Sequence, residues 1–363
     1  MKKNKNYVDL KDQPVPEGQH LLEVDDLKMY FHTEDGVVRA VDGVSYTLDR
    51  GETLGVVGES GSGKSVTAMT IMGLISMPPG KIEGGDVRYR GRSILEMTEE
   101  EMQHIRGNDI AMIFQDPMTS LNPVYKIGRQ VGEGLRLHCG YSKQEALKRA
   151  TELLDLVGIP EPEKRVNEYP HQFSGGMRQR VMIAMALACD PDILIADEPT
   201  TALDVTIQAQ IIELMQEMQE KNGNAIIMIT HDLGVVADMA DKIMVMYAGR
   251  PVEFGTAEEI FYESRHPYTW GLIRSIPEQA IEEKKPLTPI HGNPSSLMNL
   301  PEGCVFSPRC PYATDKCRKQ RPERVVTESG HYSACHYSGD PEFLKNAPET
   351  SRTRKDSKKG GEA

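Results

Sequence analysis

The segment GESGSGKS (residues 58–65) constrains the fold of this chain more than any other stretch. It follows an apolar run, ETLGVVG (52–58), and opens a helix-like run, KSVTAMTIMGLI (64–75). In this context glycines let backbone N–H groups turn toward phosphate oxygens, and the helix N-terminus adds positive potential. We therefore predict a nucleoside triphosphate site in which Lys64 reaches the β- and γ-phosphates and Ser65 binds Mg²⁺. The residues expected around the phosphates are Gly58, Ser60, Gly61, Ser62, Gly63, Lys64, Ser65 and Val66.

The hydrophobic pattern after this loop predicts a parallel sheet. Two runs are apolar throughout, DILIAD (192–197) and NAIIMIT (224–230), and each follows a segment with helical spacing. Strands that are apolar on both faces and alternate with helices are typical of α/β folds in which helices cover both sides of the sheet. The expected fold class is therefore α/β.

The strand 192–197 also supplies two adjacent acids. Asp197 would lie at its carboxyl end, where a carboxylate can hold the Mg²⁺ shell. Glu198 follows directly and would polarise an attacking water. Strand ends often carry an acid without function, but an adjacent Asp-Glu pair after an apolar run favours the functional interpretation here.

A second anion-binding surface is predicted at FSGGMRQR (173–180). Ser174, Gly175 and Gly176 stand at the start of a helix, where backbone N–H groups are unpaired. One nucleotide rarely needs two phosphate cradles in one chain. The simplest interpretation is a dimer in which this surface closes over the nucleotide of the other subunit.

At this point the chain resembles the ATP-binding cassette family over residues 21–275. The resemblance is carried by six motifs in order: residues 58–65, FQD (114–116), SGG (174–176), ADEP (196–199), TALD (201–204) and ITHD (229–232). It implies a P-loop NTPase with a RecA-like core, an antiparallel β subdomain, and a helical subdomain at about 118–180.

The resemblance also implies roles for matching residues. Gln115 would contact the Mg²⁺ and water region, Asp204 would lie at the dimer seam, and His231 would hold the γ-phosphate. Phe31 or Tyr30 would stack on adenine, with Phe31 favoured, although an aromatic on a first strand is more often ordinary packing. The implied catalytic set is Glu198, His231, Lys64 and Gln115, and the implied Mg²⁺ set is Ser65, Gln115 and Asp197. The signature carries Phe173 and Met177 where Leu and Gln are commonest, but its Ser-Gly-Gly core is intact.

The segments ESRHPYTWGLIRSIP (263–277) and IHGNPSSLMNLPEGCVFSPRCPYA (290–313) resemble the peptide permease branch of this family. That branch implies an ATPase powering import of oligopeptides or dipeptides. Its partners would be two integral-membrane permease subunits and a second ATPase chain, usually non-identical, with a homodimer as the alternative. A solute-binding protein outside the cytoplasm would deliver the cargo, and this chain would lie on the cytoplasmic face of the membrane. Nickel or another solute remains an alternative cargo.

Composition limits the other function classes. A net charge of −12 argues against a general nucleic-acid binder, and no apolar run approaches the roughly 18–20 residues that cross a bilayer. The basic N-terminus is followed by no apolar segment, so we predict no signal peptide. A cassette ATPase acting in translation or DNA maintenance is the main alternative. Members of those classes carry two cassettes or long coiled coils, which this sequence lacks.

Four cysteines lie near the C-terminus, at 304, 310, 317 and 335. Their spacing, C-x5-C, C-x6-C and C-x17-C, is longer than most zinc knuckles and does not decide between zinc, an iron–sulfur cluster and unmetallated thiols. His331 and His336 would be alternative zinc ligands. The resemblance to the peptide permease branch favours a four-iron four-sulfur cluster on Cys304, Cys310, Cys317 and Cys335. The expected cofactors are thus ATP, Mg²⁺ and this cluster.

Changes in composition predict four parts of the chain. Residues 1–20 are expected to form a flexible arm and 21–275 the nucleotide-binding domain. Residues 276–340 would form the Cys-rich extension. The polar residues 341–363 would form a disordered tail.

Overall fold

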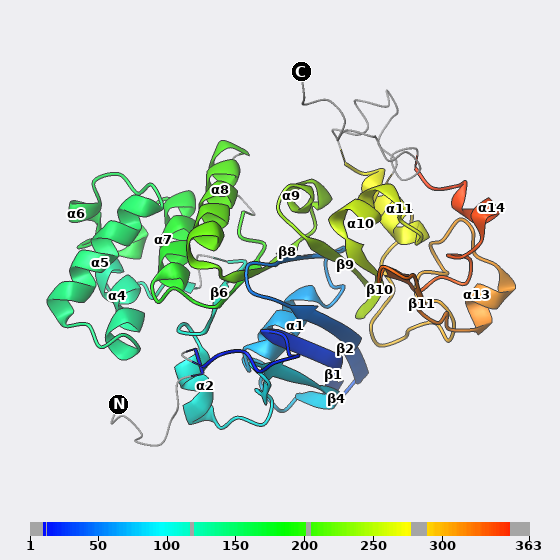
Figure 1. Cartoon of the computed structure of the whole chain (residues 1–363), viewed down its shortest axis with the longest axis horizontal. Coiled ribbons are helices and arrows are strands. Elements are labelled where there is room, and N and C mark those ends of the chain that lie inside the picture. The colour runs from blue at the N-terminus through cyan, green and yellow to red at the C-terminus, as the bar shows by residue number, and fades with distance from the viewer. Residues whose placement is uncertain (1–9, 12, 117–119, 201–204, 277–288, 349–363) are drawn as a thin grey trace.

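The computed structural model describes residues 10–11, 13–116, 120–200, 205–276 and 289–348. Two sheets and a group of helices form the molecule, with the helices α4 to α7 at one end and the last elements of the chain at the other (Figure 1). The expected mixture of a parallel core sheet, an antiparallel sheet and a helical region is confirmed.

The larger sheet has eight strands in the order β11-β12-β10-β9-β3-β8-β7-β6. Neighbouring strands from β9 to β6 run parallel, whereas β10, β12 and β11 pair antiparallel. Every residue of β3, β7 and β8 is buried, as expected for parallel strands covered on both faces. The strand bounds in chain order are β3 Thr53–Val57, β6 Ile110–Ile113, β7 Ile193–Asp197, β8 Ala225–Thr230, β9 Lys242–Tyr247, β10 Arg250–Thr256, β11 Val325–Val326 and β12 Tyr332–Ser333.

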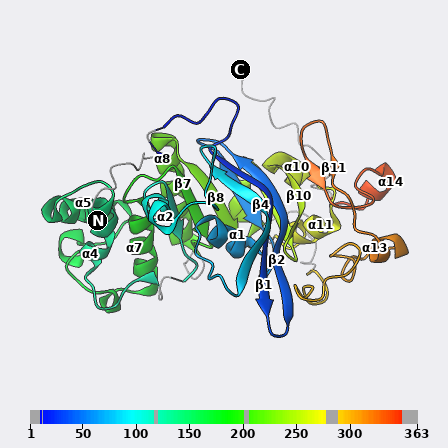
Figure 2. The same ribbon diagram turned by 90° about the horizontal axis from the view of Figure 1, so that it is seen from below.

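The smaller sheet is antiparallel, in the order β2-β1-β4-β5. Its apolar face shares one core with α1 (Lys64–Ile71) and with one side of the larger sheet. Figure 2 shows the long β1–β2 hairpin and β4 beside α1. The bounds are β1 Leu22–Thr33, β2 Gly36–Leu48, β4 Gly80–Tyr89 and β5 Arg92–Ser93, followed by helix α2, Glu99–Ile105.

A buried carboxylate joins this small sheet to the parallel core. Asp192, just before β7, accepts hydrogen bonds from the Tyr89 hydroxyl at 2.5 Å and from Arg90 Nε at 3.0 Å. Arg50 Nη2 donates to its other oxygen at 2.6 Å. The side chains of Arg90 and Asp192 are 3% and 5% exposed, so this is a buried ion pair with its hydrogen bonds satisfied.

Helices α4 to α7 form a separate group in the stretch of chain between β6 and β7. Ser142 begins α5 with a capping box, in which its hydroxyl accepts from the Glu145 N–H and Glu145 accepts from the Ser142 N–H. The apolar faces of these helices share a core with α8 and β6 to β8. The bounds are α4 Ile127–Leu137, α5 Lys143–Leu156, α6 Pro162–Arg165, a 3₁₀ turn Pro170–Gln172, α7 Gly175–Leu187 and α8 Val205–Asn222.

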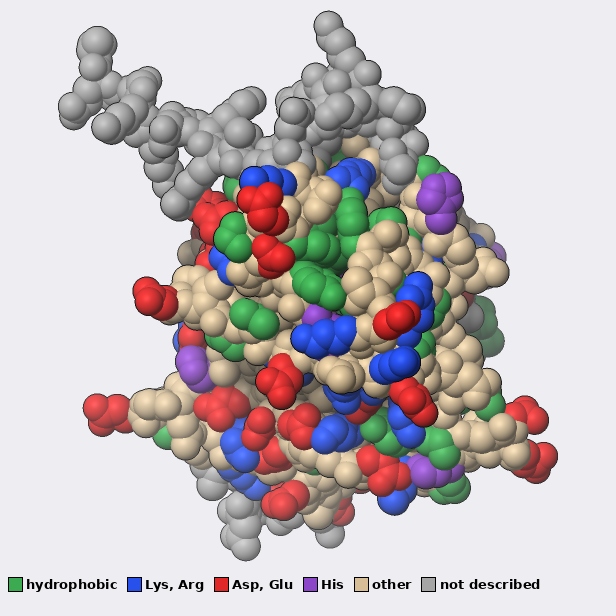
Figure 3. Space-filling model, turned by 90° about the vertical axis from the view of Figure 1, so that its right-hand side faces the viewer, with side chains coloured by type: hydrophobic (Ala, Val, Ile, Leu, Met, Phe, Trp, Pro, Cys, Tyr) green, Lys and Arg blue, Asp and Glu red, His purple; other side chains and the backbone are tan. Residues whose placement is uncertain are grey.

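The last part of the chain packs against the β9–β10 edge of the larger sheet. β12 pairs with β10, and a third core joins these strands to Val305 and Phe306. Figure 3 faces this end of the molecule, where acidic and basic side chains intermingle over the lower half and hydrophobic ones gather above them. The helices here are α9 Leu233–Ala237, α10 Ala257–Tyr262, α11 Pro267–Ile273, α13 Asp315–Lys319 and α14 Pro341–Leu344.

Two segments expected to be loose have contacts in their described parts. Leu10 is 1% exposed, and Lys11 Nζ donates to the carbonyls of Cys189 and Asp190, each at 2.7 Å. At the other end, the ring of Phe343 in α14 lies 5.3 Å from that of Trp270. Burial of Leu10 and the ring contact of Phe343 offset part of the entropy of ordering the short segments around them.

Within the described parts of the chain, no helix is long and apolar enough to cross a membrane.

Candidate functional site

The phosphate loop connects β3 to α1, as predicted. Gly58 and Gly63 have φ of +153° and +100°, and a Cβ on either would approach a backbone oxygen, of Met246 or Ala40, to 2.2 Å. Only glycine fits these two positions. Gly61 has φ of +76° and faces open space, and Ser60 beside it is exposed, so this part of the loop can accept a phosphate.

Lys64 lies at the base of the loop, 5% exposed. Its Nζ donates to the carbonyls of Gly58 at 2.7 Å and Glu59 at 3.1 Å. Burial lowers the pKa of Lys64, and the nearby carboxylates of Glu198, Asp197 and Glu59 oppose this shift. An incoming phosphate would provide the counter-charge that the two carbonyls supply only in part.

Ser65 and Asp197 meet although they are 132 positions apart. The Ser65 hydroxyl, on the first turn of α1, donates to Asp197 Oδ1 at the end of β7 at 2.9 Å. Burial raises the pKa of Asp197 above its usual range, and the negative charge of Glu198 adds to this effect. A hydroxyl and a carboxylate side by side at the strand ends suit Mg²⁺, which prefers oxygen ligands. Its positive charge would offset the free-energy cost of burying the ionised Asp197 carboxylate.

Glu198 joins two other predicted residues. Gln115 Nε2 donates to Glu198 Oε2 at 3.1 Å, and His231 Nδ1 lies 3.4 Å from Glu198 Oε1. The Glu198 backbone has φ of +47°, and its N–H donates to the carbonyl of Ile229 on β8. A non-glycine residue whose backbone is held in this left-handed conformation is fixed by the structure around it, which is typical of functional sites. The His231 side chain is 63% exposed, so it can meet a ligand from solvent.

The structure does not bring every predicted residue to this cluster. Ser174 begins α7, where its hydroxyl accepts from the Met177 N–H at 3.3 Å, and Gly175 faces open space. Gly176 follows in the same helix. Both ribbon views have α7 among the helices at one end of the molecule, away from α1 (Figures 1 and 2).

The two aromatic candidates on β1 differ in their contacts. The Tyr30 hydroxyl donates to Asp42 Oδ1 at 2.9 Å, and the Arg39 guanidinium lies 6.0 Å from the Tyr30 ring centre. Phe31 is half-buried beside Val38 of β2. Asp204, predicted at the dimer seam, lies outside the described residues.

Three contacts of the loops around this site were not predicted from the sequence. Arg309 pairs with Glu59 of the phosphate loop, and the Tyr268 hydroxyl accepts from the Glu59 N–H at 2.8 Å. Gln179 Nε2, on α7, donates to the carbonyl of Pro199 at 2.6 Å. For the contacts of Arg309 and Tyr268 with Glu59, the only signal in the sequence was the acidic side chain of Glu59 inside the phosphate loop.

The prediction of an iron–sulfur cluster is wrong. Across the described residues, which include Cys304, Cys310, Cys317 and Cys335, no group of three or more His, Cys, Asp or Glu side chains is arranged to hold a metal ion. The zinc alternative fails on the same finding.

The surroundings of these cysteines give the physical reason. The four thiols line one cavity of about 20 Å³ that is walled by aromatic rings, including those of Phe306 and Phe343. None of the four forms a disulfide. Burial raises the pKa of Cys310 to about 11 and of Cys335 to about 12, so both remain neutral thiols at physiological pH. The candidate histidines have other partners: His331 lies 3.0 Å from Glu253 Oε1, and His336 lies 2.9 Å from the carbonyl of Gln320.

Comparison with known proteins agrees with this geometry in two separate regions. Residues 41–201 match the family model described as ABC transporter, and residues 252–317 match that of the oligopeptide/dipeptide transporter C-terminal region. Among solved structures, a dimeric post-hydrolysis state of the ATP-binding cassette MJ0796, bound to ADP and Pi, superposes with a TM-score of 0.59 at 28% identity. The match covers 65% of this chain and 98% of that one.

Two curated relatives are similar over most of their length. The oligopeptide transport ATP-binding protein OppD of Bacillus subtilis is 57% identical over 312 residues, covering 86% of this chain and 87% of that protein. The dipeptide transport ATP-binding protein DppD of Escherichia coli is 52% identical over 320 residues, covering 88% and 97%. Because this identity spans the cassette and the C-terminal region alike, the chain belongs to the ABC transporter family, among the ATP-binding ATPases of the oligopeptide and dipeptide transport branch.

Proposed function

We propose that this chain hydrolyses ATP to power the import of oligopeptides or dipeptides through a membrane complex. The observation that carries this proposal is the match of residues 252–317 to the oligopeptide/dipeptide transporter C-terminal region, in a chain whose residues 41–201 match the ABC transporter model. Its relatives include proteins named for oligopeptide and for dipeptide transport, so both cargo sizes fit.

The residues around Glu198 would perform the hydrolysis. Lys64 would bind the β- and γ-phosphates, while Ser65, Asp197 and Gln115 would hold Mg²⁺, which neutralises phosphate charge when bound. Glu198, already fixed by Gln115 and His231, would accept a hydrogen bond from the attacking water and take its proton. His231 would contact the γ-phosphate, since it lies beside Glu198 and is exposed.

A dimer would complete the nucleotide site. Ser174, Gly175 and Gly176 stand at the start of α7, where the first N–H groups of a helix have no partner within the helix, but α7 lies in the helical region of the same chain, away from α1. We propose that they close over the nucleotide of a second ATPase subunit, with Asp204 at the seam, and that this subunit is a non-identical chain. Phe31 would stack on adenine, because the hydroxyl of Tyr30 is engaged by Asp42.

The chain would have two main parts in its transporter. The nucleotide-binding domain would span 21–275, with a helical subdomain at about 118–180, and a C-terminal extension would cover 276–340. Two permease subunits would hold it at the cytoplasmic face of the membrane, and a solute-binding protein would bring peptide to the opposite face.

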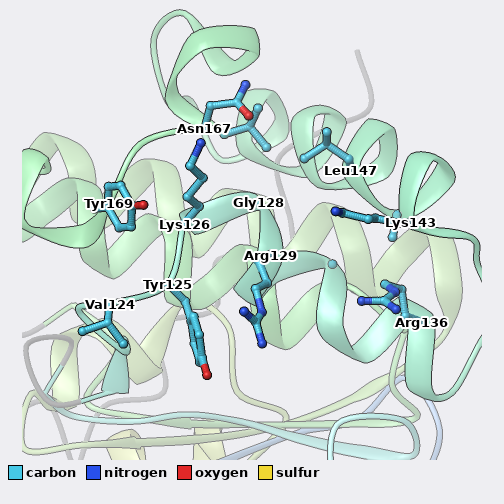
Figure 4. A pocket seen from close by; sticks show the side chains of 13 residues that line it. Val124, Tyr125, Lys126, Gly128, Arg129, Arg136, Lys143, Leu147, Asn167 and Tyr169 are labelled. Carbon is cyan, nitrogen blue, oxygen red and sulfur yellow. The ribbon is translucent and has the colours of Figure 1, made fainter.

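The permease would dock in a cavity of about 720 Å³ between α4 and α5 (Figure 4). Its lining combines four basic side chains with exposed apolar ones, and the Arg129 guanidinium lies 3.7 Å from the centre of the Tyr125 ring. Apolar contacts ringed by cations suit a short helix whose C-terminus or acidic side chains point inward. The basic residues are Lys126, Arg129, Arg136 and Lys143. Because this cavity follows the Gln115 loop along the chain, closure at the nucleotide could move the docked helix.

Reversing one charge in this cavity should uncouple the two processes. We expect Arg129→Glu to lower peptide uptake by about tenfold, because it repels the docked segment, while ATP hydrolysis by the isolated chain stays near wild type. Lys148→Glu is the matched control, since Lys148 is an exposed residue of α5 outside the lining. Equal uptake losses in the two variants would contradict the docking site.

Peptide uptake by cells tests the function itself. Deleting the gene should abolish uptake of a labelled tripeptide while leaving uptake of the free amino acids unchanged. The wild-type chain should restore uptake, whereas Lys64→Ala should not, because the phosphates lose their buried cation. Normal peptide uptake in the deletion strain, with no related ATPase chain expressed, would exclude the proposal.

A further inference from the structure

A carboxylate stands inside the phosphate loop. Glu59 follows Gly58 directly, and its backbone is part of the cradle: its carbonyl accepts from Lys64 Nζ at 3.1 Å and from the Ser62 N–H at 3.2 Å. Its side chain is 29% exposed. A negative charge this close to the position of a triphosphate would weaken ATP binding unless a cation neutralised it.

That cation comes from the other end of the chain. Arg309 Nη1 donates to Glu59 Oε2 at 2.5 Å and Arg309 Nη2 to Glu59 Oε1 at 3.0 Å, across 250 positions of sequence. This is the bidentate geometry in which a guanidinium binds a carboxylate most strongly. The hydrogen bond with Glu59 raises the pKa of Arg309 above its usual range.

Arg309 is fixed in this position by its own segment. Its side chain is 4% exposed, its Nε donates to the carbonyl of His291 at 2.9 Å, and its Nη2 also donates to that of Ile290 at 3.1 Å. The guanidinium lies 5.8 Å from the centre of the Tyr247 ring. A buried arginine with this many partners has lost its freedom to leave the carboxylate.

The same region contacts the nucleotide site at two further points. The Tyr268 hydroxyl, on α11, accepts from the Glu59 N–H at 2.8 Å. The Arg39 N–H, on the β1–β2 hairpin that carries Phe31, donates to the carbonyl of Leu297 at 3.1 Å. The segment from Ile290 to Arg309 therefore spans from the phosphate loop to β2, the strand that pairs with the strand of the aromatic candidate Phe31.

We propose that Arg309 is a positioning residue for ATP: it neutralises and orients Glu59, so that the C-terminal region sets the affinity of the phosphate loop for nucleotide. The inference rests on the proposed ATPase function but not on the transported cargo. Loosening of the segment 290–309 would release a negative charge into the cradle and lower ATP affinity. Ordering of the segment would restore it.

The test is a charge-neutralisation cycle on the purified full-length chain. Arg309→Met should raise the Kd of ATP by about 10- to 30-fold, because Glu59 is left unpaired beside the phosphates. Glu59→Gln should bind ATP within about threefold of wild type, and Glu59→Gln combined with Arg309→Met should match Glu59→Gln alone. The loss of ATP affinity in Arg309→Met should be smaller at high salt, because salt screens the repulsion between Glu59 and the phosphates. Arg318→Met, which breaks the exposed pair with Asp315 in the same region, is the control and should leave the Kd unchanged.

A merely structural role would give different results. If Glu59→Gln fails to restore binding in the Arg309→Met background, or if Arg309→Met binds ATP like wild type, the proposal is overturned. If Arg309→Met does not fold, Glu59→Asp gives the same test, since it keeps the charge but shortens the side chain away from Arg309. Glu59→Asp should bind ATP more weakly than Glu59→Gln, and equal affinities would overturn the proposal. If the ATP affinities are as predicted but the chain does not support peptide uptake in cells, the proposed cargo is wrong and the proposed role of Arg309 still holds.

Discussion

Replacing Glu198 by Gln should reduce ATP hydrolysis by about 10²- to 10⁴-fold while leaving ATP binding intact. The amide keeps the size of the side chain and its hydrogen bond to Gln115 in one orientation, but it cannot take a proton from water. Because Glu198 is 13% exposed and held by its neighbours, the substitution should not disturb the loop. Hydrolysis is measured as phosphate release and binding by equilibrium titration with ATP.

The same variant should also trap the proposed dimer in its closed state with ATP, seen as a nucleotide-dependent dimer in solution. Glu217→Gln is the matched control, since Glu217 is an exposed residue of α8 and should leave turnover unchanged. If Glu198→Gln hydrolyses ATP at a rate near wild type, Glu198 is not the general base.

Replacing Asp192 by Asn should destabilise the fold by about 3–5 kcal/mol, the usual cost of removing one partner from a buried ion pair. The substitution leaves the Arg90 guanidinium, 3% exposed, without its counter-charge and weakens the hydrogen bond from Tyr89. The free energy of unfolding is measured by urea denaturation.

The position of the Arg90–Asp192 pair predicts which part of the protein unfolds first. Since Asp192 joins the small sheet to the parallel core, the loss should appear as separate unfolding of the small sheet before the rest. Asp315→Asn is the control, because its pair with Arg318 is exposed and such pairs contribute little. Equal stability of Asp192→Asn and the wild type would show that the pair does not stabilise the fold.

The core fold and much of the site were predictable from local pattern. Ser65 and Asp197 meet because the phosphate loop that leads to Ser65 follows β3, Asp197 ends β7, and the carboxyl ends of these parallel strands lie on one edge of the sheet. The same rule brings Glu198 and His231 together, after β7 and β8. Apolar strands, helix spacing and glycine positions carry this information in short stretches of sequence.

Other parts depend on contacts that no local pattern encodes. Nothing near Glu59 indicates that its partner is Arg309, and the burial of Leu10 does not follow from the polar sequence around it. The cysteine prediction failed for a related reason: spacing along the chain says which thiols could meet but not whether the fold arranges them to hold a metal ion. Tertiary packing decides all three cases.

The pairing of β12 with β10 has a consequence for assembly. Without it, the seven residues of β10 would form the end of the larger sheet, and such an edge can pair with a strand of another chain; β12 pairs with Glu253 and Phe254 in the middle of β10. The sheet instead ends at β11, which has two residues, Val325 and Val326, directly after Arg324. At this end of the sheet the outermost strand is therefore too short to pair with more than a few residues of another chain.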